Sequence, residues 1–267
     1  MNKELAGLST QERKIISYFT ANEKEIIGID DLLSLHPCPR GTANQILSRL
    51  TRKGWLQRLK RGVYTIVPIT SSTPKPVIEN AWPLAMDFFR PAFISGWSAA
   101  EYWDLTEQIF NTISVVTMTP QRVTNQVIGG IRFRTRVIIK KKFFGTITKW
   151  FGSKVVEIAD PNRLVIDILD LPRFGGGAQH TVDIMRNFWH SNNCDPDLLL
   201  KYALRFQRGS LFKRLGFLTE KFGTPVPEGW IRECQRNIST GISNLDPDGP
   251  ASGKIISKWN LRVNIRI

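Results

Sequence analysis

The sequence contains little cysteine and no long apolar run. Its three cysteines (Cys38, Cys194 and Cys234) are widely spaced and form no CxxC pair, which argues against a disulfide framework and a structural zinc site. No segment approaches the roughly 18 apolar residues that a membrane helix requires. The opening segment MNKELAGLSTQERK lacks the apolar core of an export signal. We therefore expect a cytoplasmic protein with reduced thiols and no membrane partner.

Acidic residues are also scarce. The chain of 267 residues has 37 Lys and Arg against 23 Asp and Glu, a formal net charge of +14. Residues 40–61 and 108–156 contain no acid at all, although they carry seven and nine basic residues. Such clustering is more informative than the total charge, because a concentrated positive field attracts polyanions and above all nucleic acid.

The local patterns of residues 1–68 predict helices followed by a hairpin. Ser9 and Glu12 form a capping-box pattern at the start of a first helix that extends to about Ala21. The segment IDDLLSL predicts a short second helix, and the prolines of HPCP end it. A third helix is expected over 40–53, followed by β-rich runs over 55–59 and 63–67 around a tight turn at 60–62. This order predicts a winged helix-turn-helix domain.

The third helix has one apolar and one polar face. Ala43, Ile46, Leu47 and Leu50 form the stripe that should be buried. The polar face and the hairpin predict an interface with double-stranded DNA, made by Arg40, Thr42, Asn44, Gln45, Ser48, Arg49, Arg52, Arg58, Lys60 and Arg61. Thr42, Asn44, Gln45 and Arg49 would face base edges, and the later basic residues would meet phosphates. Winged helices also serve as protein-docking modules, so that alternative stays open.

A linker and a larger domain follow. The segment PITSSTPKPVIE is rich in proline, serine and threonine, which predicts a spacer over residues 69–80. Residues 81–267 predict a mixed α+β domain. Its expected helices cover 81–89, 95–103, 161–171, 178–189, 197–207 and 210–222, and its expected strands cover 113–118, 129–139, 155–159 and 259–265.

A second basic row lies in this larger domain. In GGIRFRTRVII the arginines alternate with apolar residues, which predicts that they point outward from one strand, and three lysines follow. The row consists of Arg132, Arg134, Arg136, Lys140, Lys141 and Lys142. It is either the solvated face of a sheet or a further surface for the DNA backbone, tRNA or an acidic partner.

The sequence offers no motif for catalysis. Asp160 precedes a helix as a cap, and we interpret Asp167 and Asp170 as parts of a solvated helix face rather than as metal ligands. Gly175–Gly177 lacks the pattern of a phosphate-binding loop and predicts a turn. No catalytic residue, metal site or cofactor is therefore predicted, and the protein is not expected to be an enzyme.

Five segments, taken together, resemble a known family. They are ILSRLTRKGWLQRLKRGVYTIVP, FISGWSAAEYWDLTEQIFNTISVVT, ADPNRLVIDILDLPRFGGG, LLLKYALRFQRGSLFKRLGFLTEKFG and LDPDGPASGKIISKWNLRVN. In this order they resemble the AbiEi-type antitoxins, transcriptional regulators of the type IV (abortive-infection, phage-defence) toxin–antitoxin class. One departure is Tyr102-Trp103, where relatives often carry a histidine.

The resemblance implies a protein with two activities. A winged helix would repress the protein's own operon, often at inverted repeats, and the larger domain would counteract a nucleotidyltransferase-type toxin without needing a stable complex. Two alternatives remain open at this point. One is a nucleic-acid-processing enzyme that a winged helix targets, and the other is a plain transcriptional regulator without a toxin partner.

Overall fold

The structure is a computed structural model that describes residues 7–22, 24, 26–67, 81–152 and 154–267. The chain divides into two compact units. We call residues 1–87 with 127–131 the N-terminal unit and residues 88–126 with 132–267 the C-terminal unit. The predicted linker, residues 69–80, lies outside the described residues and stays a prediction.

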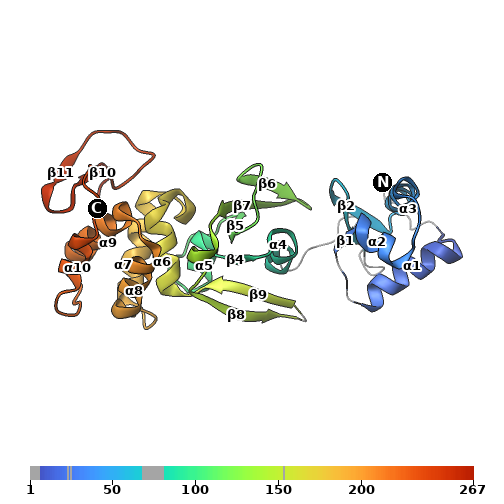
Figure 1. Cartoon of the computed structure of the whole chain (residues 1–267), viewed down its shortest axis with the longest axis horizontal. Coiled ribbons are helices and arrows are strands. Elements are labelled where there is room, and N and C mark those ends of the chain that lie inside the picture. Colours follow the sequence, from blue (N-terminus) through green and yellow to red (C-terminus); the bar gives the residue numbers. More distant parts are fainter. Residues whose placement is uncertain (1–6, 23, 25, 68–80, 153) are drawn as a thin grey trace. The chain divides into compact units, whose positions relative to one another are not determined.

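Three helices and a small sheet build the N-terminal unit (Figure 1). In chain order they are α1 (Thr10–Ala21), β1 (Ile26–Gly28), α2 (Ile29–Leu35), α3 (Arg40–Arg52), β2 (Leu56–Lys60) and β3 (Val63–Ile66). The strands form an antiparallel sheet in the order β1-β3-β2. The predicted capping box is confirmed, because Glu12 N–H donates to Ser9 Oγ and Ser9 N–H donates to the Glu12 carboxylate.

The core of this unit contains the stripes that the sequence predicts. Ala43, Ile46, Leu47 and Leu50 of α3 pack with Ile15, Ile16 and Phe19 of α1 in one buried cluster. Gly62 turns the β2–β3 hairpin with φ +76°, a conformation that glycine adopts without steric cost. Strand β1 was not predicted, since three residues are too few to show alternation.

A six-stranded mixed sheet forms the centre of the C-terminal unit. Its order is β6-β7-β5-β4-β9-β8. The elements are α4 (Ala81–Phe89), which begins in the N-terminal unit, β4 (Ala92–Ile94), α5 (Gly96–Tyr102), β5 (Thr112–Thr117), β6 (Asn125–Ile128), β7 (Ile131–Val137), η1 (Lys140–Lys142), β8 (Thr146–Phe151) and β9 (Lys154–Ala159). Strand β5 pairs parallel with β7 and antiparallel with β4, so the sheet is mixed.

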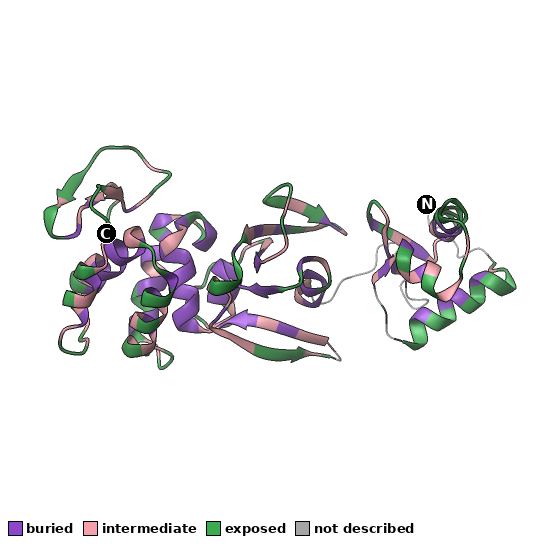
Figure 2. Ribbon diagram, viewed as in Figure 1, coloured by how far each residue is buried: buried purple, intermediate pink, exposed green. Residues whose placement is uncertain are grey.

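A layer of helices follows the sheet (Figure 1). It contains α6 (Pro161–Asp170), η2 (Pro172–Gly175), α7 (Ala178–His190), α8 (Pro196–Phe206), α9 (Gly209–Phe222) and α10 (Trp230–Arg236). The chain then forms a small sheet from β10 (Ser243–Asn244), β11 (Lys254–Ile256), η3 (Ser257–Trp259) and β12 (Leu261–Val263). Helix α6 is buried along almost its whole length (Figure 2), so it forms part of the core of this unit.

The mixed α+β class is confirmed, and the differences from prediction are local. Strands β4, β6, β8, β10 and β11 and helix α10 were not predicted. Trp259 was expected in a terminal strand but lies in the turn η3, where its indole is fully buried. No helix among the described residues is long and apolar enough to span a membrane.

Candidate nucleic-acid interface

Helix α3 presents its polar face to solvent. Thr42, Asn44, Gln45, Ser48, Arg49 and Arg52 are all exposed, whereas the four residues of its apolar stripe are at most 4% exposed. Gln45, Ser48 and Arg52 lie opposite the stripe, at spacings of three and four residues. The face therefore carries donors and acceptors that a groove of DNA could receive.

The hairpin that follows α3 is basic at its tip. Arg58, Lys60 and Arg61 are exposed, and Arg58 Nε donates to the Lys60 carbonyl at 3.3 Å. Among the described residues Arg61 and Arg52 have no ion-pair partner. At the other end of α3, Arg40 pairs with Asp30 at 2.9 Å, a contact in which both side chains are well exposed. Exposed pairs of this kind contribute little stability and exchange readily for a phosphate.

A buried carboxylate fixes the flank of α3. Glu12 of α1 is 1% exposed, and its two oxygens lie 2.7 Å from Arg49 Nε and 2.7 Å from Lys53 Nζ. Burial by itself raises the pKa of Glu12, but the hydrogen bonds from Lys53, Ser9 and Arg49 outweigh it and lower the pKa to about 2. Arg49 Nε therefore donates to Glu12 of α1, and this contact holds the Arg49 side chain at the edge of the polar face. The sequence pattern indicates Glu12 only as a capping residue and carries no signal for this second role.

The second basic row does not form one continuous free surface. Arg132, Lys140 and Lys141 are exposed. Arg134 lies over the Trp97 ring at 4.9 Å and donates to Asn125 and to the Arg173 carbonyl. The expectation that Arg136 points outward is wrong: its side chain is 13% exposed and pairs with Asp170 and Asp167. The long Arg136 side chain reaches the carboxyl end of α6, which supplies both carboxylates.

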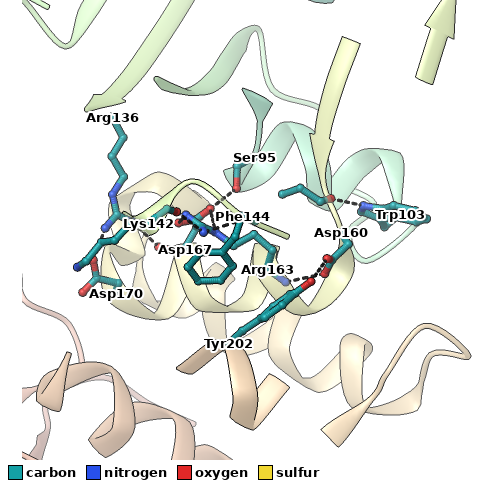
Figure 3. A network of polar contacts seen from close by, with 11 residues as sticks. Ser95, Trp103, Arg136, Lys142, Phe144, Asp160, Arg163, Asp167, Asp170 and Tyr202 are labelled. Atoms are coloured by element: carbon teal, nitrogen blue, oxygen red, sulfur yellow. Dashed lines mark hydrogen bonds and ion pairs between the residues drawn. The ribbon is translucent and has the colours of Figure 1, made fainter. Parts of the chain in front are cut away.

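The interpretation of Asp167 and Asp170 as a solvated face is also wrong. Asp167 is fully buried and accepts two hydrogen bonds of 3.0 Å from Arg163 and one of 2.9 Å from Ser95 (Figure 3). Asp170 is 5% exposed and pairs with Arg136 and Arg208. Asp160 caps α6 as predicted and accepts from Tyr202 at 2.8 Å. Over the described ranges no three His, Cys, Asp or Glu side chains are placed to share a metal ion.

These features define a basic α+β protein whose N-terminal unit exposes a polar helix and a cationic hairpin. Residues 14–67 match the family described as a transcriptional regulator, AbiEi antitoxin. This match covers α3 and the hairpin, and it confirms the resemblance seen in the sequence for that segment. No curated protein sequence matches the chain significantly.

A similarity in structure extends over nearly the whole chain. The crystal structure of the RV2827C protein from Mycobacterium tuberculosis matches with a TM-score of 0.62 and covers 96% of this chain and 92% of that one. The two sequences are 14% identical. At this identity the match shows a shared fold and carries no statement on function.

Proposed function

We propose that the protein is a DNA-binding autorepressor and antitoxin. In this proposal residues 9–67 act as a winged helix-turn-helix, with α3 in the major groove and the β2–β3 hairpin as the wing. Gln45, Ser48 and Arg52 meet base edges or the adjacent phosphates, with Thr42, Asn44 and Arg49 at the margins. Arg40, Arg58, Lys60 and Arg61 contact phosphates.

One observation carries the proposal: an exposed, acid-free polar face on α3 within the segment that matches a regulator family. A helix of this kind fits the major groove, where each base pair presents a distinct pattern of donors and acceptors. The net charge of +14 favours association with DNA of any sequence. Specificity must then come from the side chains on α3.

The DNA-binding part is tested with two variants and the DNA upstream of the gene. Replacing Lys60 and Arg61 together by glutamine should weaken binding to all duplexes and reduce the slope of log K against log salt by about two, because two phosphate contacts are lost. Gln45→Ala should instead relax discrimination between upstream and scrambled duplexes, by about 1–3 kcal/mol if Gln45 reads a base. Fluorescence anisotropy over a salt series measures both effects.

The matched control removes the same charge elsewhere. Arg232 and Arg236 of α10 are exposed, and among the described residues their ion pairs are with Glu228 and Glu233, four and three residues away, so replacing both by glutamine should leave the salt slope unchanged. Equal losses in the hairpin variant and the control would show that only net charge matters. Unchanged affinity in both N-terminal variants would remove this unit from the interface.

The antitoxin part is tested in cells. We expect the chain to restore growth when a nucleotidyltransferase encoded beside it is expressed from a separate promoter. The Lys60→Gln, Arg61→Gln variant should restore growth equally well, because the proposal assigns neutralisation to residues 81–267. Loss of rescue in that variant, at equal protein levels, would contradict the division of activities.

A further inference from the structure

A cluster of cations surrounds Asp170 at the carboxyl end of α6. Arg136 pairs with one carboxylate oxygen, and Arg208 Nε lies 3.1 Å from the other. Lys142 and Arg214 are also close enough to interact electrostatically with Asp170. Figure 3 shows Arg136 and Lys142 converging on this carboxylate from separate segments. We call these five residues the Asp170 cluster.

The cluster contains more positive than negative charge. The neighbouring carboxylate, Asp167, is committed mainly to Arg163, which contacts both of its oxygens at 3.0 Å. Four cations therefore share three sources of negative charge: Asp170, Asp246, which also interacts electrostatically with Arg214, and the carboxyl end of α6, which supplies about half a negative charge. About one and a half positive charges remain uncompensated. Such an excess is costly where water is partly excluded, and a bound anion would relieve it.

Two of the cations are placed to receive an anion. Arg208 is 58% exposed, and the Lys142 ammonium lies 3.9 Å from the centre of the Phe206 ring at a half-buried position. Burial lowers the pKa of Lys142, Asp170 opposes this, and Arg136, Arg208 and Lys141 lower it further. By contrast, Arg214 is 4% exposed and donates to the carbonyls of residues 169, 244 and 245, so it is structural.

We propose that the Asp170 cluster is a binding site for a phosphate group, with Lys142 and Arg208 as its direct donors. A phosphate monoester carries a charge of about −1.5 to −2 at neutral pH and a backbone phosphodiester carries one negative charge, so either would offset most of the excess positive charge of the cluster. Guanidinium and ammonium groups are the usual phosphate donors. The phosphate belongs either to a small phosphorylated molecule or to a nucleic-acid backbone. This site does not depend on the proposed role of the winged helix.

The test uses the full chain and two kinds of probe. Isothermal titration with pyrophosphate at low salt measures a free ligand, and anisotropy with duplex DNA measures a backbone phosphate. Lys142→Met together with Arg208→Gln should weaken binding of the relevant probe at least about tenfold, since two charge-assisted contacts are lost. Methionine preserves packing on Phe206, and Arg208→Gln alone changes an exposed side chain that the fold tolerates.

The control variant replaces Arg232 and Arg236, two exposed cations of α10, by glutamine. Loss of pyrophosphate binding in the cluster variant alone supports a small phosphorylated ligand. Weaker duplex binding in the cluster variant, larger than in the control, assigns the phosphate to nucleic acid. Equal behaviour of the two variants with both probes overturns the site. The hairpin variant described above reports separately on the winged helix.

Discussion

Replacing Arg163 by methionine is expected to lower the free energy of unfolding of the C-terminal unit by about 3–5 kcal/mol. Arg163 lies fully buried in the first turn of α6, and its guanidinium contacts both oxygens of the fully buried Asp167. It also donates to the carbonyls of Lys142 and Phe144. Methionine fills a similar volume, but it leaves the buried carboxylate with only Ser95 and the longer Arg136 contact as partners, and it removes the donor to two carbonyls.

A double variant separates the effect of the buried charge on stability from the effect of packing. Arg163→Met combined with Asp167→Leu also removes the buried carboxylate that has lost its main partner, and it should recover part of the lost stability. Urea denaturation followed by tryptophan fluorescence measures both, because six of the eight tryptophans lie in this unit. Arg232→Met, at an exposed pair on α10, should change stability by less than about 0.5 kcal/mol. A single variant no less stable than this control would show that the buried pair is dispensable.

Replacing Glu12 by glutamine should destabilise the N-terminal unit by about 1–3 kcal/mol at neutral pH. Glutamine keeps the shape but leaves Lys53 and Arg49 without their carboxylate. The pKa of Glu12 is about 2 in the folded unit against an ordinary 4.5, so its contribution is complete above pH 4.5 and declines as the pH falls toward 2. The stability difference between the two proteins should therefore shrink over that interval.

Urea denaturation of the wild type and the variant at a series of pH values tests this prediction. The difference between the two proteins isolates Glu12, because all other carboxyl groups titrate in both. A difference that stays constant from pH 5 to pH 2 would contradict the assigned pKa.

We also expect Glu12→Gln to loosen Arg49 and thereby to reduce discrimination between DNA sequences, which the anisotropy assay measures.

Several features of the N-terminal unit could be predicted because their causes are local. The spacing of Ala43, Ile46, Leu47 and Leu50 defines the buried side of α3, and the opposite side is then exposed. Ser9 and Glu12 cap α1 across three residues, and Gly62 allows the turn between two β-rich runs. The same local logic predicted most helices of the C-terminal unit.

Alternation along β7 correctly placed Phe133 inward, but it could not show what covers the opposite face. On that face Arg136 reaches the carboxyl end of α6 and pairs with Asp170, so it is not part of a free basic surface. The second role of Glu12 depends on Arg49, which is 37 residues away in the sequence. Neither contact leaves a periodic signal.

The sequence by itself determined the basic character of the protein, the helices and hairpin of residues 9–67 and the mixed α+β class. Only the tertiary structure decided which charges are paired in the interior and which reach solvent. The physical reason is that the spacing of apolar residues shows only which side of a helix or strand is buried. The partner of a buried charge is set by how distant segments pack, and this packing brings four cations to Asp170.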